Sequence, residues 1–271
     1  MTTAVRTPAV AGRFYPGRSD ELLREVRAYA SPASSAPVAA IGCVAPHAGY
    51  SYSGAVAGAV YSRLQIPEHC IILCPNHTGK GVPLSIMTTT AWQTPLGEVA
   101  VSEKLGSDLL QSFPTLQEDS AAHRSEHAIE VQLPFLQAQQ NQLHIVPIAV
   151  GISDFGVLRG LGEALAKGIG ASDQNVLIIA SSDMNHYESD AVTRVKDHKA
   201  IGRVLAMDAR GLWEVVMAEH ISMCGFGPTV VMLTAAKILG ATGATLVRYA
   251  TSGDVSGDRD RVVGYAGIVV V

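Results

Sequence analysis

The sequence has 271 residues and a formal net charge of −4 at pH 7, with 48% hydrophobic and 16% charged residues. The charged fraction lies below the usual value of about 25%, which indicates much buried surface and is compatible with a homo-oligomer. A negative net charge without a basic stripe argues against nucleic-acid binding. No apolar run approaches the roughly 20 residues of a membrane span, and the N-terminus lacks the apolar core of a secretory signal.

Helices and strands are predicted to alternate along the chain. In chain order we expect a helix at 20–29, a strand at 38–44, a helix in the second half of the small-residue run 50–62, strands at 70–74, 84–90 and 99–101, helices at 103–113 and 125–140, a strand at 144–150, a helix at 155–169, a strand at 175–180, helices at 191–205, 211–219 and 229–239, and strands at 245–250 and 262–271. This order predicts a single α/β domain over residues 1–271, with a central mixed or parallel sheet and helices on both faces.

Three histidines each follow an apolar predicted strand within a few residues: His47, His77 and His186. In open α/β sheets, ligands bind at the carboxyl ends of the strands, so these side chains are expected at one edge. Histidine is the commonest transition-metal ligand in proteins. Any one of the three could instead be a packed or turn-capping residue. Together they predict a mononuclear site for Fe, Zn or Cu.

Cys224 differs from the other cysteines because it lies in a Gly-rich turn just before a predicted apolar helix. The positive end of a helix dipole lowers the pKa of a thiol, which makes Cys224 a candidate ligand or nucleophile. The alternative is a small apolar residue that fills the turn. Cys43, Cys70 and Cys74 lie in apolar runs and are predicted to be reduced core residues, which favours a cytoplasmic protein.

Asp183 and His186 lie three residues apart in a polar turn that is predicted to open a helix. At this spacing Asp183 could orient the His186 ring, and the two would form an acid/base pair beside the metal. Alternatively, Asp183 caps the N-terminus of the following segment.

Residues 123–127 (HRSEH) match the H-x-x-E-H pattern of one class of zinc proteases. That pattern requires all five residues on one helix, whereas Ser125 is a predicted N-cap that leaves His123 outside it. A zinc-dependent hydrolase therefore stays an alternative. Glu126 and His127 could still reach the site from the helix start, and Glu130 is expected to be structural.

Several longer motifs occur in an order that resembles one known family. They are VAGRFYPG, APHAGYSYSG, CPNHTG, the W-x-T-P-L-G turn at Trp92, EHAIEVQLPFL, SSDMNHY, CGFGP and the final SGD…VVGYAG. Together they resemble the Memo family, called AmmeMemoRadiSam system protein B in prokaryotes. The resemblance covers nearly the whole chain and implies a fold similar to that of the class III extradiol dioxygenases, which are non-haem iron enzymes.

The resemblance also implies roles for individual residues. It implies metal ligands at His47, His77 and Cys224, and pocket residues at Asp183, His186 and His127. The dioxygenases use a carboxylate where this sequence has Cys224, and a thiolate changes the redox behaviour of iron. We expect a dioxygenase-like oxidoreductase with Fe(II), or with Cu or Zn, that acts on an unknown small molecule. The alternative is a non-catalytic metal-binding, redox or peptide-binding adaptor protein.

Overall fold

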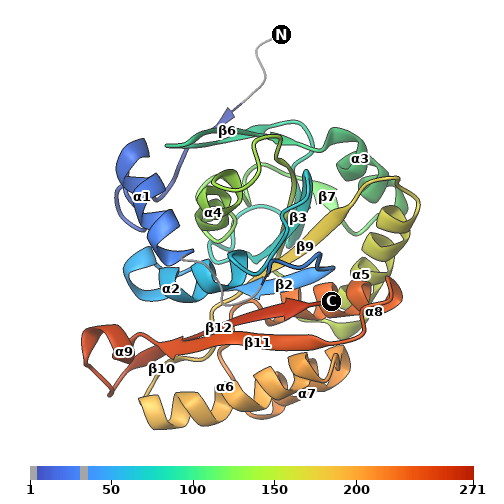
Figure 1. Ribbon diagram of the computed structural model, residues 1–271. Coiled ribbons are helices and arrows are strands. Elements are labelled where there is room, and N and C mark those ends of the chain that lie inside the picture. The colour runs from blue at the N-terminus through green and yellow to red at the C-terminus, as the bar shows by residue number, and fades with distance from the viewer. Residues whose placement is uncertain (1–4, 31–35) are drawn as a thin grey trace.

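One mixed sheet of twelve strands runs through the computed structural model, which describes residues 5–30 and 36–271 (Figure 1). Across the sheet lie β1 (Val5–Arg6), β5 (Ala91–Thr94), β6 (Gly97–Val101), β8 (His144–Val150), β3 (His69–Pro75), β9 (Val176–Ser181), β2 (Gly42–Ala45), β12 (Val262–Val270) and β10 (His186–Glu188). Beside this row, β11 (Ala244–Thr251) pairs with β12, β4 (Leu84–Ile86) pairs with β8, and β7 (Gln117–Glu118) pairs with β4. The central strands β8, β3, β9 and β2 are parallel, whereas β12 is antiparallel to β2.

The central strands are apolar because both of their faces are covered. In β3, Ile71 and Leu73 join the hydrophobic core on one face of the sheet, and Ile72 and Cys74 join the core on the other. All four side chains are fully buried. The alternation of side chains along a strand thus places one apolar run in two cores.

Helices cover both faces, as the sequence predicts. One core is closed by α1 (Ser19–Tyr29), α2 (Tyr50–Tyr61) and α4 (Leu133–Gln137), and the other by α3 (Glu103–Ser112), α5 (Phe155–Gly170), α6 (Asp190–Leu205), α7 (Ala209–Ala218) and α8 (Phe226–Ile238). A short helix, α9 (Gly253–Ser256), joins β11 to β12. The α/β class is therefore confirmed. None of the helices in the described ranges is long and apolar enough to cross a membrane.

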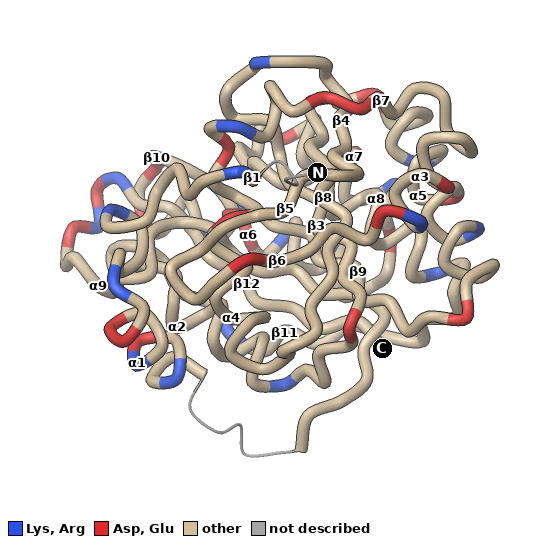
Figure 2. The backbone as a smooth tube through the Cα atoms, turned by 90° about the horizontal axis from the view of Figure 1, so that it is seen from above, with Lys and Arg blue, Asp and Glu red and all other residues tan. Residues whose placement is uncertain are grey.

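Charged residues of both signs are interspersed along the backbone over the whole molecule (Figure 2). The small residues of α2 allow a second helix to pack closely against it. A Cβ atom on Gly58 would lie 2.4 Å from the backbone of Tyr29, so the glycine allows close approach of α1. This fixes α1 against α2.

The helix predicted at 125–140 is wrong in its first half. Residues 121–125 form turns, a 3-10 turn covers Glu130–Gln132, and only then does α4 begin. The Glu126 carboxylate accepts hydrogen bonds from the backbone N–H groups of His127 and Ala128 at 2.9 and 3.0 Å. A side chain that binds local N–H groups offers the backbone an alternative to the helix.

Some predicted ends of strands and helices differ from the observed ones by a few residues. The strand predicted at 38–44 begins at Gly42, and the one predicted at 84–90 ends at Ile86. The helix predicted from 229 begins at Phe226, so Pro228 lies inside its first turn. Strands β1, β5, β7 and β10 were not predicted, because two to four residues carry too little periodicity.

A buried ion pair ties the N-terminal strand to the segment before α4. Arg6 donates to the Glu130 carboxylate at 2.6 Å, and both side chains are almost completely buried. The same guanidinium donates to the backbone carbonyls of His123 and Glu126 at 3.0 and 2.6 Å and lies 4.2 Å above the Trp92 ring. These contacts confirm the predicted structural role of Glu130.

We expect Arg6→Ala to lower the free energy of unfolding by about 3–5 kcal/mol, because it leaves the Glu130 carboxylate buried without its cation. Urea denaturation followed by circular dichroism measures this. Adding Glu130→Gln should recover part of the loss, since a neutral amide is cheaper to bury than a charge. The control is Arg159→Ala, which breaks an ion pair exposed on both sides. Equal effects of Arg6→Ala and Arg159→Ala would contradict the assignment.

Candidate metal centre

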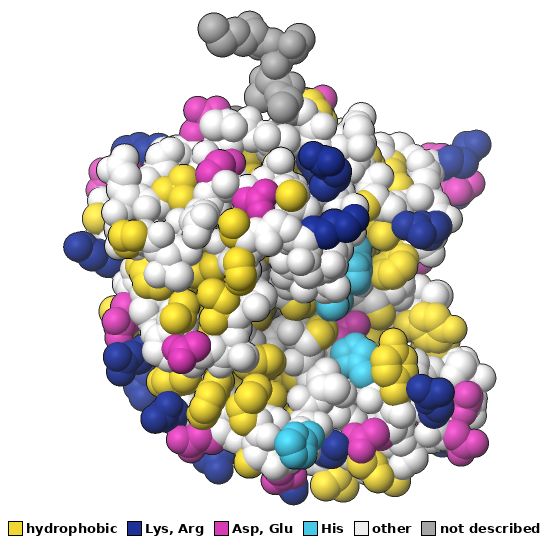
Figure 3. All heavy atoms as spheres, turned by 180° about the vertical axis from the view of Figure 1, so that it is seen from behind, with side chains coloured by type: hydrophobic (Ala, Val, Ile, Leu, Met, Phe, Trp, Pro, Cys, Tyr) yellow, Lys and Arg dark blue, Asp and Glu magenta, His cyan; other side chains and the backbone are white. Residues whose placement is uncertain are grey.

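Three turns meet at one edge of the sheet because their strands are neighbours. β3, β9 and β2 lie side by side and parallel, so their carboxyl ends coincide. His77, Asp183 and His47 each lie two residues beyond the end of one of these strands. Histidine side chains line a hollow in the face seen in Figure 3. The adjacency that the sequence pattern predicts for His47 and His77 is therefore observed.

His47, His77 and Cys224 form a compact group of possible ligands. One nitrogen of each ring and the Cys224 Sγ all lie within 4.8 Å of one another. The Sγ lies 3.2 Å from His47 Nε2, and the centroids of the two imidazole rings are 5.1 Å apart. Cys224 reaches this group from the turn that precedes α8.

Glu126 orients His77. One carboxylate oxygen accepts from the backbone N–H of His77 at 2.7 Å, and the other lies 2.9 Å from His77 Nδ1. Burial raises the pKa of Glu126, but the hydrogen bond and charge of His77 outweigh it and lower that pKa to about 2. Burial lowers the pKa of His77, but the hydrogen bond to Glu126 and the charges of Glu126 and Asp183 together outweigh it, so the pKa of His77 is raised. With Nδ1 held by Glu126, Nε2 of His77 is left for a ligand.

His47 is held by groups at the end of β9. Its backbone N–H donates to Asp183 Oδ1 at 2.7 Å, and its Nδ1 lies 2.9 Å from the Ser181 hydroxyl. Burial and then the neighbouring His77 lower the pKa of His47 well below its ordinary value. The ring is therefore neutral, which is the form that binds metals.

Asp183 and His186 do not form the predicted orienting pair. His186 Nδ1 lies 2.9 Å from the Ser222 carbonyl and its backbone N–H donates to the Ser222 hydroxyl at 2.8 Å, whereas Asp183 bonds to His47. His186 opens β10 rather than a helix, and Ser189 caps the next helix, so Asp183 is not that cap. Burial raises the pKa of Asp183, against the opposing hydrogen bond from His47.

His127 lies beside the candidate ligands. Its ring stacks on that of His77, with centroids 4.9 Å apart and an angle of 20° between the planes, and it meets the edge of His47 at 5.5 Å. The Phe14 ring also contacts it edge-on, with centroids 4.9 Å apart. Burial lowers the pKa of His127, although Glu126 opposes this shift.

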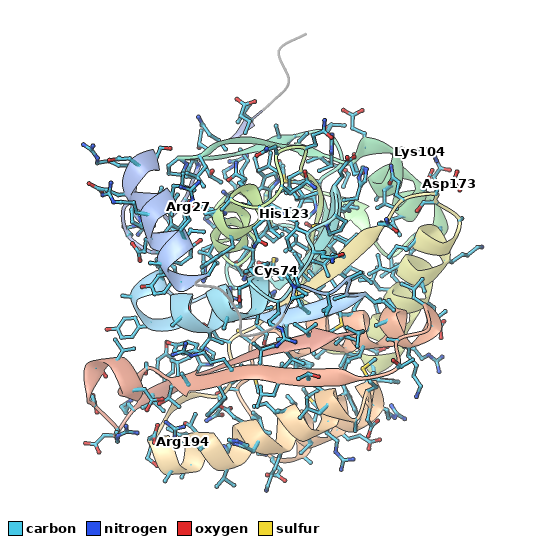
Figure 4. All side chains as sticks on the ribbon, in the orientation of Figure 1. Arg27, Cys74, Lys104, His123, Asp173 and Arg194 are labelled. Carbon is cyan, nitrogen blue, oxygen red and sulfur yellow. The ribbon has the colours of Figure 1, made fainter. Side chains whose placement is uncertain are left out.

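His123 does not belong to this group of ligand atoms, and it is fully buried in the interior (Figure 4). Its Nε2 lies 2.7 Å from the Ser85 hydroxyl, and its ring meets Trp92 edge-on at 6.0 Å. Burial lowers its pKa to about 4. The helix that the H-x-x-E-H pattern requires is not formed. Glu126 reaches the site and His123 does not.

The predicted lowering of the Cys224 pKa is wrong for the metal-free thiol. Burial and then the nearby Asp183 carboxylate raise it well above its ordinary value. Cys43, Cys70 and Cys74 are buried, unpaired core residues as predicted, and Figure 4 places Cys74 inside the molecule.

Sequence analysis missed three residues that hold the histidines of the site in place. Ser181 contacts the His47 ring, Gln132 contacts Ser181, and Ser222 contacts His186. Gln132 Nε2 donates to Ser181 Oγ at 2.8 Å, and both side chains are fully buried. A polar residue within the apolar run Val131–Leu136 was a usable signal, because buried amides require partners. Ser222 acts through its backbone and hydroxyl, and nothing in its sequence context marked it.

Comparison with known proteins gives a consistent result. The model of the family described as "Memo-like protein" matches residues 6–269. A MEMO1 family protein of Methanopyrus kandleri is 42% identical over 277 residues, covering 97% of this chain and 98% of the relative. Another, of Methanosarcina mazei, is 43% identical over 267 residues, covering 98% of this chain and 99% of the relative.

Among solved structures, an uncharacterised protein of Escherichia coli K12 is similar in fold. The TM-score is 0.53 with 10% sequence identity, and the match covers 84% of this chain and 98% of that one. At this identity the likeness concerns the fold alone.

We expect the metal-free protein to react slowly with iodoacetamide at Cys224. At pH 7.5 its rate constant should lie at least about tenfold below that of a free cysteine derivative, because a raised pKa leaves less thiolate. The rate should rise as the pH passes 9, the ordinary pKa of a thiol. Mass spectrometry after chelation measures the modification, with Cys224→Ser as the control. A rate above that of the free thiol would show that the helix dipole prevails.

Proposed function

The chain belongs to the family of Memo-like proteins, and from this premise we propose that it binds one transition metal ion through His47, His77 and Cys224. The single observation that carries the proposal is the convergence of these three ligand atoms within 4.8 Å of one another. We further propose that the ion is Fe(II), with Cu or Zn as alternatives, and that the protein is a dioxygenase-like oxidoreductase acting on a small organic molecule.

The donor set supports a transition metal. Zn–N distances near 2.0–2.1 Å and Zn–S distances near 2.3 Å, in tetrahedral geometry, require nitrogen and sulfur ligands about 3.5 Å apart. The distance of 3.2 Å between Cys224 Sγ and His47 Nε2 is close to this. Imidazole and thiolate ligands suit Fe, Cu and Zn, whereas Mg²⁺ and Ca²⁺ prefer oxygen. Three protein ligands also leave positions open for substrate.

The surrounding side chains support acid/base work beside such an ion. The Ser222 carbonyl can only accept, so His186 Nδ1 carries the proton and His186 Nε2 is left as a base. We assign it to proton removal from the substrate, with His127 as a second base close to His77. Asp183 holds the backbone of His47 in place. When bound, Fe(II) would hold O₂ and the organic substrate together and pass electrons from the substrate to O₂.

A second candidate function is a non-catalytic protein that holds the metal for redox handling or for binding a peptide partner. The thiol at Cys224 favours it, because soft sulfur ligands select Cu(I). In this case His186 and His127 would contact the partner rather than move protons.

We expect His47→Ala, His77→Ala and Cys224→Ser each to lose most of the bound metal, because each removes one of three ligands. Mass spectrometry of metals in protein purified both anaerobically and aerobically measures occupancy and identifies the ion. The matched control is His144→Gln, which removes a histidine at the amino-terminal end of β8. Unchanged occupancy in the three ligand variants, or loss in His144→Gln, would contradict the proposed centre.

We expect the Fe(II)-loaded protein to consume O₂ with at least one compound from a panel of catechols and thiols. His186→Gln should slow this by roughly 10²–10⁴-fold, the range for removal of a general base, while metal occupancy is retained. The control is His198→Gln, whose ring bonds to a carbonyl of its own helix. If no compound raises O₂ uptake above that of the protein alone, the second candidate function is favoured.

A further inference from the structure

A chain of buried hydrogen bonds lies beneath His47, outside the group of candidate ligands. It runs from the Pro46 carbonyl through the Gln132 amide and the Ser181 hydroxyl to the Ala128 carbonyl, with a branch to the His47 ring. The side chains of Gln132 and Ser181 are fully buried, and His47 is 2% exposed. No solvent contact is therefore needed to satisfy these groups.

The Pro46 carbonyl fixes the orientation of the Gln132 amide. A carbonyl can only accept a hydrogen bond, so the atom 3.0 Å away must be the Gln132 nitrogen and not its oxygen. The oxygen then accepts from the Tyr61 hydroxyl at 2.8 Å. The second N–H of the amide points at Ser181 Oγ at 2.8 Å and occupies one of its two lone pairs.

The Ala128 carbonyl fixes the direction of the Ser181 hydroxyl. It lies 2.7 Å from Ser181 Oγ, and since it too can only accept, the single hydroxyl proton points at it. Ser181 Oγ is then left with one lone pair, which faces His47 Nδ1 at 2.9 Å. Reversing any step would place two acceptors against each other in the interior, where an unpaired polar group is costly.

We propose that Gln132 and Ser181 set the tautomer of His47, so that the proton stays on Nδ1 and the Nε2 lone pair faces Cys224. Ser181 and Gln132 are thus positioning residues. Cys224 does not decide the tautomer, because its S–H can donate to Nε2 and its sulfur can equally accept, at 3.2 Å. His77 obtains the same tautomer by a different device, the Glu126 carboxylate. The link to metal affinity rests on the proposed function, whereas the tautomer itself does not.

The tautomer is measurable in the metal-free protein by long-range proton–nitrogen NMR on ¹⁵N-labelled histidine rings. In the wild type we expect His47 to carry its proton on Nδ1 in at least about tenfold excess. In Ser181→Ala we expect the Nε2–H form of His47 to appear, while His77 remains protonated on Nδ1. A wild-type His47 protonated on Nε2, or a Ser181→Ala protein with an unchanged tautomer, would overturn the proposal.

Metal affinity provides a separate readout. We expect Ser181→Ala to weaken binding of Fe(II) or Zn²⁺ by roughly 10–100-fold, as is usual when a partner of a ligating histidine is lost. The control is Ser85→Ala, which removes an equally buried hydroxyl that pairs with His123, away from the ligand group. An equal loss of affinity in Ser85→Ala would overturn the assignment to Ser181.

The two measurements separate the two proposals. A wild-type protein with the expected tautomer but no metal affinity would refute the metal site and leave the tautomer assignment standing. A wild-type protein that binds the metal but has His47 protonated on Nε2 would refute the tautomer assignment and leave the metal site standing. The wild-type spectrum decides the tautomer even if Ser181→Ala does not fold, which a thermal melt would show.

Discussion

The parallel pairing of β3, β9 and β2 is the constraint on which the rest of the site depends. Neighbouring strands lie about 4.8 Å apart, so the turns after the two outer strands are about twice that distance from each other. His47 and His77 come from these outer turns, and their ligand atoms converge to within 4.8 Å. The end of β9 lies between them, and its Ser181 and Asp183 hold His47 by its ring and by its backbone. A different strand order would separate the two rings.

The rings of His47 and His77 are held together by buried polar groups. One of these groups, the Glu126 carboxylate, also affects the backbone of its own segment. Glu126 is fully buried and has protein N–H groups in place of water. A side chain that binds local N–H groups offers the backbone an alternative to the helix, and the chain from 121 to 129 forms turns and irregular backbone. The buried guanidinium of Arg6 holds the same segment, since it donates to two of its backbone carbonyls. The functional geometry and the irregular backbone therefore have one cause.

The sequence predicts those features that depend on periodicity or on strand ends. The α/β class, the central strands and the adjacency of His47 and His77 follow from apolar runs that stop at polar turns. The Asp183–His186 pair could not be judged in this way, because its partners come from residues distant in the chain. His186 bonds to Ser222, and Asp183 bonds to His47. Long-range hydrogen bonds of this kind leave no periodic signal, and neither do strands of two residues.

Cys224 shows how burial and charge compete at the site. The dipole of α8 carries about half a positive charge at its N-terminus, whereas burial and the full negative charge of Asp183 act against ionisation of the thiol. In the metal-free protein the thiol stays protonated, and its Sγ lies 3.2 Å from His47 Nε2 and 3.6 Å from the Asp183 carbonyl oxygen. A divalent cation at the proposed centre would reverse this balance, since it supplies more charge than the dipole and binds the sulfur directly. Binding would then release the thiol proton. The environment that makes Cys224 a poor free nucleophile is therefore compatible with a metal ligand.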